Sequence, residues 1–327
     1  MFTTTVSQIG VSAAALSELD QKANINLVSD DGSLLMDSTY QYSVSGNGYF
    51  AYMWVPETAK HLNGIMIAKS NLIEGRLMES KTVRNVLAKY NIGVVYMHSR
   101  NTTKMPSKNT VMGDFIYLDD SKAEQYNVSE PLGAGARIDE MMARLASVSG
   151  YEELKYAPII GVGHSAGMGL GKVTGSWDPK RTIAQICLKS GTALTSPGVS
   201  GGAYAGDNYE IQPGVPTYLA AGQFTEHASY ENPAGKDNYI DGEISKLKNI
   251  RAKGTDRLIT MSVEWEAGHY DWSEYSNEIV AEYLDGVIPA RLGTQASSQE
   301  MISEDYELVD LTKSGYVADT KMYGLHI

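Results

Sequence analysis

A serine flanked by glycines could act as a nucleophile in this chain. Gly163-His-Ser-Ala-Gly167 fits the pattern G-x-S-x-G, follows the apolar run Ala157-Pro-Ile-Ile-Gly-Val162 and precedes small residues typical of a closely packed helix. At such a strand-to-helix turn the neighbours need almost no side chain, and the Ser165 hydroxyl projects out of the sheet. The Ala166 N–H, at the start of the helix, is placed to stabilise an oxyanion formed at an attacked carbonyl.

These residues allow a second interpretation, and the motif itself occurs twice in the chain. Gly161–Ala166 also fits the dinucleotide fingerprint G-x-G-x-x-A, which requires an acidic residue at the end of the next strand. The next apolar run ends instead at Lys189. A second G-x-S-x-G, Gly198–Gly202, has no apolar strand before it. The context therefore favours Ser165 as nucleophile over a nucleotide site or a nucleophile in the second match.

A serine hydroxyl needs a base to accept its proton and an acid to orient that base. In enzymes with this turn, the acid and then the histidine follow later strands. His269, between the last expected strand and the closing helix, is the candidate base. Glu226, just past the expected strand 215–221, is the candidate acid, with Asp237 and Asp241 as alternatives.

A second oxyanion donor is expected after the first parallel strand, in the segment Lys69–Glu74. The segment lacks the H-G-G-G run of many lipases, so the donor would be a backbone N–H near Asn71 or Leu72. The sequence has no H-E-x-x-H and no clustered ligand spacing, so we expect neither a metal nor another cofactor.

Aromatic residues surround the candidate base. Trp265, Tyr270 and Trp272 flank His269 and are candidates for the wall of a substrate pocket, with core packing an equal alternative for at least one of them. His164, next to the nucleophile, is a further candidate for substrate contact.

Hydrophobic patterning predicts one α/β domain. Strands alternate with helices from about residue 64, which predicts a mostly parallel sheet with helices on both faces. An extended pattern with turn signals over residues 25–56 predicts an antiparallel pair at one edge of that sheet. The expected divisions are a polar leader, 1–24, the domain, 25–290, loop or cap excursions near 98–133 and 192–214, and a tail that packs on the domain, 291–327.

The composition and net charge of the chain limit the classes of partner and substrate that we expect. The 327 residues include 39 acidic and 27 basic side chains, a net charge of −12, which argues against nucleic acid or an anionic membrane surface as partner and favours a small neutral ester. The single cysteine, Cys187, excludes a disulfide framework. No signal peptide or membrane-spanning run is visible, and the compartment and oligomeric state are left open.

Over roughly residues 45–290 the chain resembles the α/β-hydrolase superfamily, through the Gly163–Gly167 turn, Glu226 and Gly268-His269. More narrowly, it is similar to a poorly characterised branch of serine esterases at Trp54-Val-Pro-Glu57, Asn71–Glu74 and Gly315-Tyr-Val-Ala-Asp319. The resemblance implies an α/β-hydrolase fold and serine hydrolase activity, with some members of the branch associated with carbohydrate esters.

The resulting hypothesis is a metal-independent carboxylic ester hydrolase. Ser165 attacks the ester carbonyl, His269 accepts and returns the proton, Glu226 orients His269, and water hydrolyses the acyl-enzyme. An amidase or peptidase with the same triad remains an alternative. So does a binding protein on a hydrolase fold that has lost its chemistry.

Overall fold

The structure is a computed structural model, and it describes residues 21–25, 40–46, 49–69, 73–99, 131–164, 168–189, 211–224 and 239–313. No helix within these ranges is long and apolar enough to cross a membrane.

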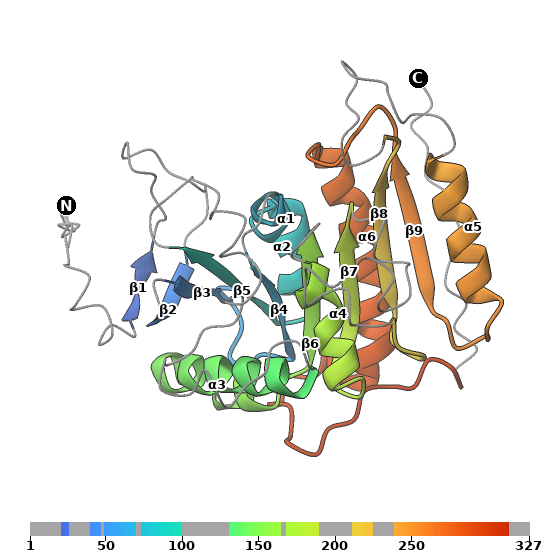
Figure 1. Ribbon diagram of the computed structural model, residues 1–327. Helices are drawn as coiled ribbons and strands as arrows, with labels where there is room; N and C mark the ends of the chain where they lie inside the picture. Colours follow the sequence, from blue (N-terminus) through green and yellow to red (C-terminus); the bar gives the residue numbers. More distant parts are fainter. Residues whose placement is uncertain are drawn as a thin grey trace, which may run out of the picture.

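Within the described residues, nine strands form one sheet in the order β1-β2-β3-β5-β4-β6-β7-β8-β9 (Figure 1). Six of them, β5, β4, β6, β7, β8 and β9, run parallel, whereas β1, β2 and β3 pair in antiparallel fashion at one edge. The strands are β1 (Gln21–Ile25), β2 (Tyr40–Gly46), β3 (Tyr49–Trp54), β4 (Gly64–Lys69), β5 (Ile92–Ser99), β6 (Ile159–His164), β7 (Thr182–Leu188), β8 (Thr217–Gly222) and β9 (Ile259–Glu264).

This topology confirms the expected fold class. The central strands β4, β6, β7 and β8 are buried along their whole length, as parallel strands covered on both faces must be. The antiparallel edge is the one predicted from the extended pattern near the amino terminus. The order and directions of the strands are those of the α/β-hydrolase fold.

Helices cover both faces of the sheet, as Figure 1 shows. Leu170 and Val173 of α4 pack with Ile138 and Leu145 of α3 on one face, and α1, α2 and α6 pack on the other. The helix α5 packs on β7, β8 and β9. The helices are α1 (Glu74–Met78), α2 (Lys81–Lys89), α3 (Pro131–Ser149), α4 (Met168–Trp177), α5 (Tyr239–Arg251) and α6 (Glu274–Leu292), with 3-10 turns at Glu152–Lys155 and Gly293–Ser297.

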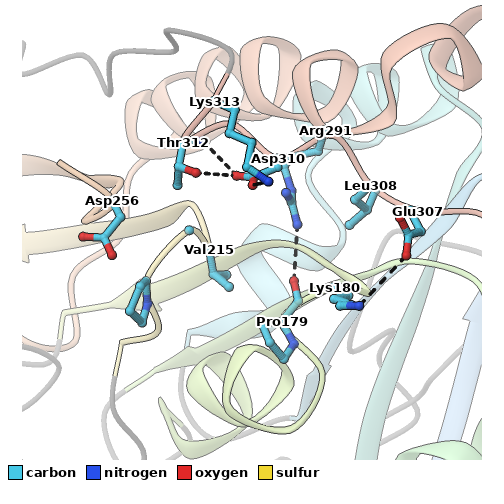
Figure 2. Close-up of a pocket in the computed structure, with 12 residues that line it drawn as sticks. Pro179, Lys180, Val215, Asp256, Arg291, Glu307, Leu308, Asp310, Thr312 and Lys313 are labelled. Carbon is cyan, nitrogen blue, oxygen red and sulfur yellow. Dashed lines mark hydrogen bonds and ion pairs between the residues drawn. The ribbon is translucent and has the colours of Figure 1, made fainter. Parts of the chain in front are cut away.

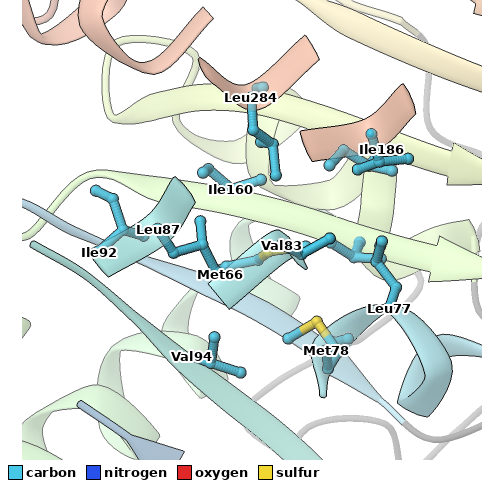
Figure 3. Packing of buried hydrophobic residues seen from close by; sticks show 14 of the residues in the cluster. Met66, Leu77, Met78, Val83, Leu87, Ile92, Val94, Ile160, Ile186 and Leu284 are labelled. Carbon is cyan, nitrogen blue, oxygen red and sulfur yellow. The ribbon is translucent and has the colours of Figure 1, made fainter. Parts of the chain in front are cut away.

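The largest buried cluster lies between the sheet and the layer formed by α1, α2 and α6. Figure 3 shows Leu284 of α6 beside Ile160 and Ile186 of the central strands, and Leu87 of α2 beside Met66 and Ile92. Closely packed cores of this kind have low compressibility, so the strand ends that leave the core are held at fixed positions. The candidate site is built on those strand ends.

Three elements differ from the sequence-based expectation. The strand β1 begins within the expected polar leader, at Gln21. The short helix α1 occupies the end of the segment expected to be an oxyanion loop. The helix α6 runs through Pro289 to Leu292, past the expected end of the domain at residue 290, because Val287, Ile288 and Leu292 are fully buried and tertiary packing outweighs the cost of a proline in a helix. Residues 1–20, 100–130 and 190–210, which include most of the expected leader and excursions, lie outside the described part, as does the end of the expected tail, 314–327.

Candidate active site

The residues predicted to do chemistry fall into two groups. Ser165, Ala166, Asn71, Leu72, Glu226 and the alternative acid Asp237 lie outside the described residues. His164, His269, Trp265, Tyr270, Trp272 and the other alternative acid, Asp241, are described. The chain on both sides of the first group is also described, so the surroundings of the site can be built from its neighbours.

The sheet positions the expected nucleophile by ending a buried strand directly before it. The strand β6 ends at His164, and α4 begins at Met168. This helix packs very close to the sheet: a Cβ on Gly171 would lie 2.9 Å from the carbonyl oxygen of Ile186 and 3.1 Å from the backbone nitrogen of Gly163. Glycine is therefore required there, and the strand and helix can approach as a G-x-S-x-G turn needs.

A buried carboxylate links the segment after β4 to the end of β6. Glu74, at the start of α1, is completely buried, and its Oε1 accepts a hydrogen bond of 3.0 Å from the His164 N–H. Glu74, the last residue of the expected oxyanion segment, is thereby bonded to the end of the strand that leads to Ser165. Sequence reasoning missed this role, although a glutamate next to apolar Ile73 was a visible signal.

The two histidines at the centre of the prediction lie together. The ring of His164 is 4.6 Å from the ring of His269, centroid to centroid, and its Nε2 lies 2.9 Å from the carbonyl oxygen of His269. Burial, and the nearby His269 and Lys189, lower the pKa of His164 to about 3, although the contact with the His269 carbonyl opposes this shift. His164 is therefore neutral at physiological pH. His269, 105 residues away in the chain, is thus held against the residue that precedes Ser165.

The loop of residues 265–272, here called the histidine loop, is bonded to the end of β8. The Phe224 N–H donates to the carbonyl oxygen of Ala267 at 3.1 Å, and the Glu266 N–H donates to the Gln223 side chain at 2.8 Å. A Cβ on Gly222 would lie only 2.6 Å from the Ala267 oxygen, so the loop crosses the strand end in close contact. The segment that leads from β8 to Glu226 therefore begins beside His269.

The three aromatic candidates for the wall of a substrate pocket differ in the exposed fraction of their surface. Trp265 and Tyr270 are 45% and 55% exposed, and the Tyr270 ring contacts the His269 ring edge to face at 4.8 Å. Trp272 is only 7% exposed and donates its indole N–H to Asn277 at 2.8 Å. Trp272 is therefore the core residue among the three.

One further expectation needs correction. His164 was a candidate for substrate contact, but it has no exposed surface. It sits beneath the histidine loop, where it can support His269 and cannot touch a substrate. The alternative acid Asp241 is exposed in the first turn of α5.

A separate cavity of about 520 Å³ lies away from these residues (Figure 2). Pro179, Val215 and Asp256, which precede β7, β8 and β9, line it together with the segment 307–313. It therefore lies at the amino ends of these strands, opposite the edge that carries His164 and His269. In Figure 2, Arg291 reaches across to the carbonyl oxygen of Pro179, at 3.3 Å, which ties α6 to the turn before β7. The described residues contain no group of three potential metal ligands.

No family model and no curated protein matches the chain. Similar solved structures include an S-formylglutathione hydrolase from Agrobacterium tumefaciens, with 16% identity and a TM-score of 0.48 over 80% of this chain and 99% of that chain. A poly(3-hydroxybutyrate) depolymerase from Bordetella parapertussis has 10% identity and a TM-score of 0.45 over 76% of this chain and 87% of that chain. Est1E from Butyrivibrio proteoclasticus has 13% identity and a TM-score of 0.39 over 75% of this chain and 96% of that chain.

At TM-scores below 0.5 these likenesses assign no activity to this chain. The class of the protein, an α/β-hydrolase fold, rests on the order and directions of its strands. The closer resemblance to one branch of serine esterases stays a prediction.

Proposed function

We propose that the protein is a serine hydrolase that cleaves carboxylic esters with Ser165 as nucleophile, His269 as base and Glu226 as acid. The observation that carries the proposal is the contact of His269 with His164, the residue directly before Ser165 at the end of β6. A base must lie within hydrogen-bond reach of its nucleophile, and this contact supports that geometry.

The chemistry follows from these roles. His269 takes the proton of the Ser165 hydroxyl as the oxygen attacks the ester carbonyl, and the Ala166 N–H and an N–H near Asn71 or Leu72 stabilise the oxyanion. The intermediate collapses to an acyl-enzyme, and His269 returns the proton to the departing alcohol. Water then attacks the acyl group with the same base, which releases the acid and restores Ser165.

The neutral state of His164 supports this role of His269. A base that receives a proton becomes a cation, and a second cation beside it would oppose the transfer. Because burial holds the pKa of His164 at about 3, the ring stacked on His269 carries no charge at the pH at which the enzyme would work. The carbonyl contact at Nε2 also fixes the backbone of His269.

The proposed substrate is a small neutral ester, with acylated carbohydrates as one class. The exposed faces of Trp265 and Tyr270 beside His269 offer apolar surface for an acyl chain, an aryl group or a sugar ring. The net charge of −12 disfavours polyanionic substrates. Rates on matched esters and amides, with acyl chains of graded length and with sugar or aryl leaving groups, would identify the preferred substrate.

A fluorophosphonate probe tests the nucleophile directly. We expect the wild-type protein to be labelled and the Ser165→Ala variant not to be labelled. Ser200→Ala is the matched control, because Ser200 sits in the second G-x-S-x-G of the chain and should not affect labelling. Unlabelled wild-type protein that is folded by circular dichroism would refute the proposal and favour a binding protein on a hydrolase fold.

A further inference from the structure

A buried ion pair lies under the histidine loop. The Lys189 Nζ and the Glu264 Oε2 are 2.5 Å apart, and their side chains are 1% and 9% exposed. Lys189 directly follows β7 and Glu264 is the last residue of β9, so the pair spans the end of β8, which lies between these two strands. It therefore joins the ends of β7 and β9, across the end of β8, at the edge that carries the candidate site.

The same two side chains bond to the far end of the histidine loop. Lys189 Nζ also donates to the carbonyl oxygen of Asp271, and the other carboxylate oxygen of Glu264 accepts the Ser273 N–H at 3.1 Å. Glu264 is the residue immediately before the loop, and Ser273 is the residue immediately after it. The ion pair thus holds the entry and the exit of the loop together.

A further hydrogen bond joins two residues within the histidine loop. The Asp271 carboxylate accepts the Gly268 N–H at 2.7 Å. Residue 269 lies within the short turn that this bond closes. Its backbone is consequently fixed relative to Lys189 and Glu264.

Burying the Lys189–Glu264 ion pair is energetically unfavourable. Burial lowers the pKa of Lys189, and the Glu264 carboxylate opposes that shift. A buried ion pair is weak support for stability, because both charges must leave water. Lys189 also has a backbone φ of 44°, in the left-handed region that non-glycine residues rarely adopt. Strain and buried charge of this kind gather where a structure must hold functional groups in place.

We infer that the Lys189–Glu264 pair is a positioning device that fixes the histidine loop so that His269 meets Ser165. This inference rests on the proposed function, and the two residues act through the loop and not on the substrate. Loss of the pair should leave the substrate surface in place and lower the fraction of time that His269 spends in the reactive position.

The test removes both charges at once. In the variant Lys189→Met/Glu264→Leu no unpaired buried charge remains, so the protein is expected to fold with a stability near that of the wild type. Active sites are counted by fluorophosphonate titration, so that kcat refers to reactive molecules. We expect kcat on an aryl ester to fall by about tenfold to a hundredfold with KM changed by less than about twofold, and labelling to slow in parallel.

Two further variants sharpen the test. Glu264→Gln keeps the shape of the side chain and an acceptor for the Ser273 N–H but leaves the buried Lys189 ammonium without its anion, so it should lower the free energy of unfolding more than the double variant does. Lys89→Met removes an exposed ion pair with Asp285 and should leave kcat unchanged. A double variant with wild-type kcat and KM per active site would overturn the inference. So would a loss of kcat that tracks only the loss of folded protein.

Amide hydrogen exchange separates this inference from the proposed function. The Gly268 amide should exchange faster in the double variant than in the wild type, whatever the activity of the protein. If the wild type neither hydrolyses esters nor is labelled, the proposed function fails, and faster exchange still supports the role of the pair in holding the loop. Unchanged exchange in the folded double variant would overturn that role.

Discussion

The imidazole rings of His164 and His269 lie 4.6 Å apart, centroid to centroid, with their planes tilted by 38°, and the Nε2 of His164 contacts the main-chain oxygen of His269. One ring belongs to the end of β6 and the other to the loop after β9, and β7 and β8 lie between these strands in the sheet. The contact therefore connects the strand before the expected nucleophile to the loop that carries the expected base. Four predictions test this arrangement.

The first concerns the proposed triad. Ser165→Ala and His269→Ala should each reduce kcat for ester hydrolysis by about a thousandfold or more, because triad members act as a unit. The double variant should be scarcely worse than either single variant. Initial rates at saturating substrate give the measurement, and additive losses in the double variant would argue against a shared mechanism.

The second concerns acid stability. The pKa of His164 is depressed to about 3 in the folded protein, so between about pH 3 and pH 6.5 the unfolded chain binds more protons at this residue than the folded protein does. The free energy of unfolding should therefore fall as the pH drops through that window, by a few kcal/mol in total at this residue. Urea titrations from pH 7 to pH 4 measure the slope.

The control for this prediction is His164→Asn, which has no titrating group. Its free energy of unfolding should depend less steeply on pH over the same range. Equal slopes in the two proteins would show that other groups account for the acid sensitivity.

The third concerns the contact between β8 and the histidine loop. A Cβ at residue 222 would meet the Ala267 oxygen at 2.6 Å, so Gly222→Ala should displace the loop and lower kcat by about tenfold or more. Gly242→Ala is the matched control, because nothing lies within 4 Å of a Cβ on this helical glycine. That substitution should leave kcat unchanged and raise stability by up to about 1 kcal/mol.

The fourth separates substrate contact from core packing among the aromatic residues. Trp265→Ala and Tyr270→Ala should raise KM for aryl or sugar esters with little effect on the melting temperature, because both side chains are exposed. Trp272→Ala should instead lower the free energy of unfolding by about 3–5 kcal/mol, because it empties a buried site. Steady-state kinetics and thermal melts on the three variants distinguish the two roles. Unchanged KM values for both exposed positions would place the substrate elsewhere.

The local pattern of apolar and polar residues determined the secondary structure elements of this protein. Apolar runs in the sequence predicted β6, β8 and the mostly parallel sheet, because strands buried on both faces are made of nearly continuous apolar residues. The strand that ends before Ser165 and the loop that carries His269 were found in the same way. The roles of Ser165 and Glu226 stay predictions, because both residues lie outside the described part of the chain.

Only the tertiary structure decided which distant residues meet. His164 contacts His269 across 105 residues of sequence, and Lys189 pairs with Glu264 across 75. The buried Trp272 bonds to Asn277, five residues further along the chain. No periodicity records such pairs, because they depend on which strands become neighbours and on how side chains pack between them. In the sequence Lys189 served only to argue against a nucleotide site, and the fold made it the support of the loop that holds the candidate base.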